Sequence, residues 1–306
     1  MTCLLWICFM PLLSMVNSTH TSSIGELLLW PVLFMTSFHF VSKNNNRINT
    51  IRLLFFIIFV LSASLFINNR FISLESQTNV IYFSIFLFPW VLLTNKKWMR
   101  NTFLVLMTFF ALLSMKRSLL IAIALVWVVW VFRTMRSARL WRRLLVLLFA
   151  AGVLVVLYRY IDSVSEGFLY ERITREETDE GNNRLAIYGS VIEMIIHSDA
   201  YSLLFGHGHN AVYGALGISA HNDFLECIYD YGLIILSLYV SLWVFVIRRC
   251  VKLYKENSVL FLPYLSSVSL FACQSLFEHL LLYTSWFNYL VIFWGCTEAL
   301  LERKKV

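Results

Sequence analysis

The chain has 306 residues, of which 59% are hydrophobic and 14% carry a charge, and its mean hydropathy is +0.71. Soluble domains carry roughly a quarter charged residues, so this composition excludes a cytosolic enzyme, a secreted disulfide scaffold and a nucleic-acid-binding protein. The net charge of +7 comes from basic clusters between apolar runs and indicates membrane topology rather than an anionic partner. The six cysteines are far apart and show neither a metal-ligand pair nor a disulfide pattern.

Ten apolar runs approach or reach the length of about 20 residues that a helix needs to cross a bilayer. In chain order they are 2–16, 25–42, 51–68, 78–94, 101–115, 117–133, 143–160, 224–247, 258–278 and 281–301. The runs 2–16 and 101–115 are short, so nine spans is the alternative count. Run 2–16 lacks a positive start and a small-residue cleavage site, which favours a span over a signal peptide.

The basic residues predict the orientation of these spans. One alternating set of loops, together with the C-terminal tail, holds 18 of the 25 Lys and Arg residues. Basic loops face the cytoplasm, so we expect both termini inside and an even number of spans. The fold class is therefore an all-α integral membrane protein with about 10 transmembrane helices, a single polytopic domain over 1–306.

One connection, residues 161–221, is much longer than the others and belongs to the outer, periplasmic side. Between 160 and 220 it carries nine acids and three arginines. Its second part, 185–196, has apolar residues at helical spacing and predicts a short helix on the membrane surface. The glycine-rich stretch 204–210 predicts a turn.

Ionisable groups near membrane depth are costly and usually functional, and here they gather where the eighth span begins. They are His221, Asn222, Asp223, Glu226 and Asp230. On a helix the three acids share one face, so we expect them to line a water-filled cavity. The alternative is a helix that begins only at Tyr231 and leaves them in a solvated loop.

Further cations lie on the same predicted side: Lys116 and Arg117 between two spans, and Arg184 at the start of the predicted surface helix. Taken singly, each is as compatible with the membrane interface as with function. His207 and His209 could form a metal site with His221, but no second cluster completes it. Glu278 and His279, at the outer end of the ninth span, form a second polar pair that could simply mark the interface. The chain has no nucleotide-binding loop, no HExxH and no DxD pair, so we expect no cofactor and no metal.

Several of these residues resemble the O-antigen ligase and O-antigen polymerase superfamily. The stretch His221-Asn222 with Gly232 eleven residues on is similar to its signature after a large periplasmic loop. Asn182-Asn-Arg184 followed by Phe205-Gly206-His-Gly208 resembles its arginine and FGxG elements. Ser114-Met-Lys116-Arg117 resembles its KR element. The likeness covers roughly 105–300, and Ile235, three after Gly232, departs from the ligase pattern and favours the polymerase (Wzy) branch.

The resemblance implies a metal-independent, inverting glycosyl transfer on the periplasmic side of the bacterial inner membrane. The substrate would be an oligosaccharide on undecaprenyl pyrophosphate, and a chain-length regulator is a possible partner. His221 would be the base, with Glu226 as competing base or as the residue that orients the imidazole, and Arg117 and Arg184 would stabilise the leaving pyrophosphate. Asn222, Asp223, Asp230, Lys116, Gly206 and Gly208 would bind substrate.

Two other functions stay open at this point. A ligase would transfer the finished glycan to the lipid A core, and a flippase or transporter would move the lipid-linked unit. A transporter would carry charges within several spans and show repeated halves, whereas the polar groups here gather on one side. This distribution favours an enzyme with one reaction site over a transporter.

Overall fold

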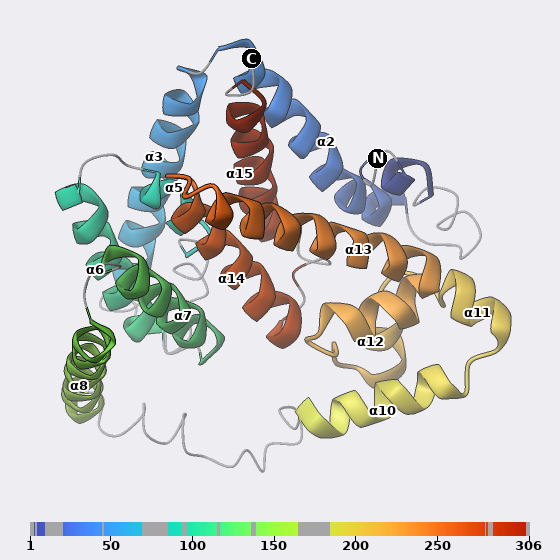
Figure 1. Cartoon of the computed structure of the whole chain (residues 1–306). Helices are drawn as coiled ribbons and strands as arrows, with labels where there is room; N and C mark the ends of the chain where they lie inside the picture. Colours follow the sequence, from blue (N-terminus) through green and yellow to red (C-terminus); the bar gives the residue numbers. More distant parts are fainter. Residues whose placement is uncertain are drawn as a thin grey trace.

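The structure, a computed structural model, describes residues 3, 5–9, 21–44, 46–68, 85–93, 97–114, 117–135, 139–164, 184–278, 280 and 284–303. In these residues the regular structure is entirely helical (Figure 1). The helices are α2 (Thr21–Lys43), α3 (Arg47–Ile67), α5 (Phe88–Leu92), α6 (Lys97–Ser114), α7 (Arg117–Thr134), α8 (Leu140–Val164), α10 (Arg184–Ile196), α11 (Ala200–Phe205), α12 (Ala211–Leu216), α13 (Asp223–Lys255), α14 (Phe261–Phe277) and α15 (Thr284–Arg303).

Most of the predicted apolar runs coincide with these helices. Each of eight helices overlaps one run, with ends that differ by eight residues at most: α2, α3, α6, α7, α8, α13, α14 and α15. Parts of runs 2–16 and 78–94 lie outside the described residues, so the count of ten and the orientation stay predictions. In the described part of the chain, two helical segments are long and apolar enough to cross a membrane, Arg47–Leu65 and Asp223–Lys255, and Phe261–Phe277 is a shorter apolar helix.

The outer surface of several helices is apolar, as a lipid-facing surface would be. Leu53, Leu61 and Leu65 of α3 are each more than half exposed, and Leu148 and Val155 of α8 are exposed to a similar degree. Water-soluble proteins rarely present such continuous apolar faces. Together with the composition, this surface indicates a membrane protein.

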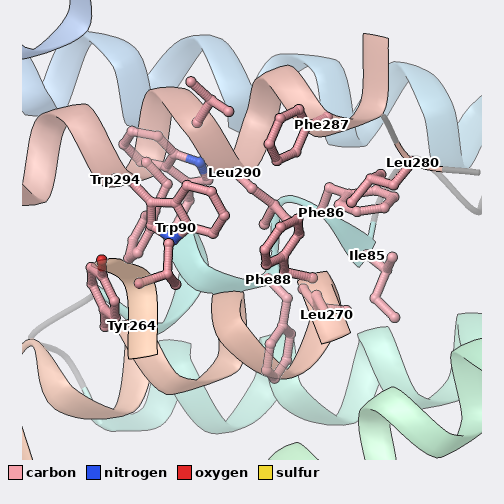
Figure 2. Packing of buried hydrophobic residues seen from close by; sticks show 14 of the residues in the cluster. Ile85, Phe86, Phe88, Trp90, Tyr264, Leu270, Leu280, Phe287, Leu290 and Trp294 are labelled. Atoms are coloured by element: carbon pink, nitrogen blue, oxygen red, sulfur yellow. The ribbon is translucent and has the colours of Figure 1, made fainter. Parts of the chain in front are cut away.

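The core lies where α5, α14 and α15 meet (Figure 2). Phe271 of α14 stacks on Phe287 of α15 with ring centroids 5.6 Å apart, and Trp294 packs edge-on against Phe271 at 5.2 Å. The indole N–H of Trp294 donates to the Ser267 hydroxyl at 2.8 Å, so its buried polar group is satisfied. This packing fixes the C-terminal end of α14, which carries one of the site residues.

Helix α2 packs tightly along α15, and the two helices end on the same side of the molecule (Figure 1). Gly295 makes this approach possible, because a Cβ there would lie 2.1 Å from the Ser37 hydroxyl. At the end of the pair the Arg303 guanidinium donates to the carbonyl of Ser42. The basic ends of these two helices therefore lie together.

Candidate active site

The site is built on the first turn of α13, which begins at a side-chain cap. The Asn222 carboxamide oxygen accepts hydrogen bonds from the backbone N–H groups of Phe224 at 3.0 Å and Leu225 at 3.2 Å. These are N–H groups that a helix leaves without internal partners. The Asn222 amide also donates to the carbonyl of Leu276, at the end of α14, at 3.4 Å. Asn222 therefore starts the helix and ties it to α14.

His221 precedes this cap in a left-handed conformation with φ of 53°. Few residues other than glycine adopt this conformation, and such residues persist where the surroundings hold them. Here both backbone polar groups of His221 are held by side chains. Its N–H donates to Glu226 Oε1 at 3.1 Å, and its carbonyl accepts from the Tyr188 hydroxyl at 3.4 Å. The backbone at His221 is thus fixed from α13 and from α10.

The imidazole of His221 meets an acid and an arginine from two other helices. Glu278, which ends α14, places Oε2 3.6 Å from His221 Nδ1 and Oε1 3.8 Å from Arg184 Nη2. Arg184 is the first residue of α10. The side chains of Arg184, His221 and Glu278 are 39%, 30% and 17% exposed, so the protein covers the cluster only in part. The structure thus brings together two predicted catalytic residues, Arg184 and His221, on either side of the Glu278 carboxylate.

The three acids of α13 lie on the helix as expected, because α13 begins at Asp223 and not at Tyr231. The expectation that they face a water-filled cavity is wrong. Asp223, Glu226 and Asp230 are only 1%, 2% and 1% exposed. Asp223 accepts from the Tyr239 hydroxyl at 2.7 Å, and Asp230 accepts from the backbone N–H of Val212 at 3.0 Å. Glu226 Oε1 accepts from the His221 backbone, whereas Glu226 Oε2 and Asp230 Oδ2 are buried without a hydrogen-bond partner among the described residues. Through the oxygens that do accept hydrogen bonds, the three acids hold the site together from within.

Gly206 and Gly208 join the segment between α10 and α13 to α13 itself, at the point where that helix is broken. Gly232 has φ of 76° and ψ of 179°, which interrupts α13, and Gly206 has a similar conformation. The N–H groups of His207 and Gly208 donate to the carbonyls of Tyr229 and Asp230, both at 2.9 Å. A Cβ on Gly206 would lie 2.2 Å from the backbone carbonyl oxygen of Asp230. A Cβ on Gly232 would lie 2.3 Å from the backbone carbonyl oxygen of Leu204. We call this close contact of Gly206 and Gly232 the glycine clasp.

The two histidines of the clasp loop have structural partners. His207 stacks on Tyr229 with ring centroids 4.3 Å apart, and its Nε2 lies 2.9 Å from the Ser198 hydroxyl. His209 Nδ1 lies 2.5 Å from the Tyr231 hydroxyl. Within the described residues no group of three or more His, Cys, Asp or Glu is placed to hold a metal ion. Both histidines thus fasten the loop to α13.

Asp199 fastens the same loop by capping α11. Its carboxylate accepts hydrogen bonds from the backbone N–H and the hydroxyl of Ser202, at 2.9 and 2.8 Å. These hydrogen bonds stabilise the carboxylate and lower the pKa of Asp199 below its ordinary value, and the bond from the backbone N–H has the larger effect. The predicted surface helix over 185–196 is present as α10, and the predicted turn over 204–210 separates α11 from α12.

The position of the second predicted arginine is known only at the level of its helix. Arg117 is the first residue of α7, but its side chain lies outside the described part of the structure, as does all of Lys116. Helix α7 packs against α14, and Figure 1 shows the start of α7 on the same side as the end of α14. That end carries Glu278. The convergence of Arg117 on the cluster therefore stays a prediction.

Sequence reasoning left Glu278 and Tyr188 out of the site. Glu278 was noted only as half of a polar pair with His279 at the predicted outer end of a span. A charged residue at the end of an apolar run is the signal that could have placed it in the site. Tyr188 gave no signal beyond its place in the predicted surface helix, because a hydroxyl that holds backbone carbonyls 33 and 88 residues away depends on tertiary structure.

The part of the chain from 102 to 240 matches the family model described as O-antigen ligase (Wzy_C). The match covers somewhat under half of the sequence, includes Arg184 and His221, and is consistent with a member of the O-antigen ligase and polymerase superfamily. This family implies a membrane enzyme of the glycosyltransferase type that acts on lipid-linked glycans. No match was found among curated proteins, and none among solved structures.

The Tyr188 hydroxyl provides a first test of the site's construction. It donates toward the carbonyls of both His221 and Leu276, the latter at 3.2 Å. We expect Tyr188→Phe to lower stability by about 1 kcal/mol, measured by thermal unfolding of the purified protein in detergent. Tyr213→Phe, at an exposed tyrosine of α12, is the matched control and should change nothing. Equal behaviour of the two variants would show that the Tyr188 hydroxyl does not hold the His221 backbone.

Proposed function

We propose that the protein polymerises lipid-linked polysaccharide repeat units, as an O-antigen polymerase in the bacterial inner membrane with its site on the periplasmic side. The donor is a growing glycan on undecaprenyl pyrophosphate, and the acceptor is the next lipid-linked unit. The observation that carries this proposal is the meeting of Arg184, His221 and Glu278 at the head of α13. An imidazole, a carboxylate and a guanidinium are the groups that such a transfer needs.

In this reaction His221 takes the proton of the acceptor sugar hydroxyl as its oxygen bonds to the anomeric carbon of the donor. The bond from that carbon to the pyrophosphate oxygen breaks, and the lipid pyrophosphate leaves with the electron pair. Because attack comes from the face opposite the leaving group, the anomeric configuration inverts. Glu278 beside Nδ1 stabilises the imidazolium that forms, as a carboxylate does for a catalytic histidine in other enzymes.

The leaving group requires positive charge, and arginine binds phosphate oxygens through a planar pair of N–H donors. Arg184 contacts Glu278 through Nη2, and the guanidinium group carries further N–H donors that can reach a pyrophosphate. Its position at the start of α10 also places it at a helix N-terminus, where the helix dipole favours negative charge. Arg117 is the second cation in this proposal, with Lys116 beside it.

The buried and backbone groups have positioning roles in the proposal. Glu226 is a positioning residue rather than the base, because it is buried and accepts from the His221 backbone. Asn222, Asp223 and Asp230 hold the start of α13, and Gly206 and Gly208 hold the loop that closes the site from the periplasmic side. A chain-length regulator remains a proposed partner.

The second candidate is the ligase, since the matching family model carries that description. Lipopolysaccharide from a deletion strain, separated on a gel, distinguishes the two functions. We expect core that bears a single repeat unit, with the ladder of longer chains lost. Naked core with lipid-linked polymer accumulating would indicate the ligase. Repeat units trapped on the cytoplasmic face would indicate a flippase and would overturn both transferase proposals.

A further inference from the structure

The other end of α13 carries a second, separate arrangement of basic and apolar groups. Along one face of the helix, Ser237, Ser241 and Val244 line a groove of about 540 Å³ that ends at the cations Arg248, Arg249 and Lys252. The hydroxyls of Ser237 and Ser241 donate to carbonyls of their own helix, at 2.6 and 2.7 Å. Both serine hydroxyls thus have hydrogen-bond partners within the helix and do not need water as a partner. The groove can therefore accept an apolar group along its length up to the basic end.

An apolar cavity of about 460 Å³ adjoins this groove between α2, α13 and α15. Its walls include the aromatic side chains of Trp30, Phe34 and Trp294. Phe245 lines both the cavity and the groove, and its ring packs edge-on against Phe34 at 6.4 Å. The groove and the cavity thus meet at one side chain.

An ion pair joins the two spaces next to Phe245. Arg249, which lines the groove, pairs with Glu298, which lines the cavity. The Arg249 guanidinium also lies over the Phe245 ring, 6.0 Å from its centroid. Lys252 lies 3.7 Å from Glu256, but both side chains are about half exposed, and such a pair contributes little. Among the ion pairs of the described residues, none involves Arg248. Glu298 and Glu256 therefore balance only part of the positive charge at the end of the groove.

From this arrangement we infer that the basic end of α13 binds an anionic phospholipid of the surrounding bilayer. The phosphate lies against Arg248, Arg249 and Lys252, and an acyl chain enters the aromatic cavity past Phe245. Basic pockets between membrane helices are a recognised kind of site for anionic headgroups. The dimensions agree, because Ser237 to Arg248 covers about 16 Å of helix, roughly half of a 30 Å hydrocarbon core.

The occupant is a phospholipid rather than the donor glycolipid. This distinction rests on the proposed function. In that function the donor's pyrophosphate lies beside His221 at the start of α13. Helix α13 bends at Gly232, which brings the Asp223 carboxylate to 2.7 Å from the Tyr239 hydroxyl. Arg248 lies about 14 Å farther along the helix than Tyr239, so one headgroup cannot occupy both places. The lipid at Arg248 is therefore a second, non-reacting molecule that packs α13 against α2 and α15.

Thermal unfolding of the purified full-length protein in detergent tests this inference without any glycan substrate. Phosphatidylglycerol, added during the measurement, should raise the unfolding temperature in a saturable way, and phosphatidylcholine should raise it much less. In the double variant Arg248→Ser/Lys252→Ser, the apparent affinity for phosphatidylglycerol should fall about tenfold or more. The control Lys43→Ser/Arg139→Ser removes two exposed cations outside the groove and should keep the response.

A second variant tests the tail without touching the charges. Met35→Trp places a large ring at the cavity wall, at a position that is 43% exposed and so tolerates the change. We expect it to reduce the phosphatidylglycerol response as well. An equal response to both lipids, an equal loss in the control, or a full response in Met35→Trp would overturn the inference. Stronger stabilisation by a polyprenyl phosphate than by phosphatidylglycerol would also overturn it. None of these outcomes depends on catalysis, so failure here is separate from failure of the proposed function.

Discussion

Replacing His221 by asparagine should reduce glycan polymerisation by about 10²- to 10⁴-fold, the usual contribution of a general base. Asparagine suits this test because it tolerates the left-handed backbone that His221 adopts, whereas alanine would add strain. The protein should still reach the membrane and unfold at a similar temperature. The measurement is polymer formation in vitro from purified lipid-linked units, supported by loss of the ladder in cells.

His197→Asn is the matched control, since His197 is an exposed histidine at the end of α10. It should polymerise as the unchanged protein does. A folded His221→Asn variant with normal activity would remove His221 from the reaction.

Glu278→Gln separates positioning from chemistry at the same site. It keeps the shape of the side chain but removes the charge beside Nδ1, so we expect a loss of about 10- to 100-fold, smaller than for His221. Because the substitution removes the charge and keeps the shape, the loss should appear in the polymerisation rate, while the unfolding temperature stays close to that of the unchanged protein. Glu193→Gln, at an exposed acid of α10, serves as the control. A purely structural Glu278 would lower the unfolding temperature and leave the polymerisation rate of the folded protein unchanged.

Much of the fold could be predicted because each helix is encoded locally. Apolar runs of the right length become helices α2, α3, α6, α7, α8, α13, α14 and α15, and Asn222 has the side chain that begins a helix. The break at Gly232 was not predicted. Its cause is the contact with Leu204 and Gly206, which are 28 and 26 residues earlier in the chain.

The site was predicted in part for the same physical reason. Arg184 and His221 stood out because charge is rare in this chain, and they do lie near one another through Glu278. The acids of α13 were misplaced because helical spacing shows that they share a face but not what covers that face. Tyr239 and the backbone of Val212 cover it. The first contact depends on the bend of α13 at Gly232, and the second depends on how α12 packs against α13.

Gly232→Ala should destabilise the protein by about 3 kcal/mol or more. The backbone of Gly232 lies in a region that only glycine adopts readily, and its added Cβ would lie within 2.6 Å of three backbone atoms, which cannot turn aside as a side chain would. In Gly206→Ala the added Cβ would lie within 2.5 Å of backbone atoms of Asp230 and Tyr231, on the other side of the same contact. Each substitution alone should therefore separate the two glycines of the clasp.

The consequence of an open clasp goes beyond stability. The loop that holds α10, and with it Arg184 and Tyr188, is fastened to α13 by the hydrogen bonds of His207 and Gly208. We therefore expect both variants to unfold at a markedly lower temperature and to lose polymerisation. Gly189→Ala is the matched control, because a Cβ there meets nothing within 4 Å in a helix, where alanine is favoured. Similar unfolding temperatures for Gly232→Ala and Gly189→Ala would mean that the clasp does not hold the segment between α10 and α13 against α13.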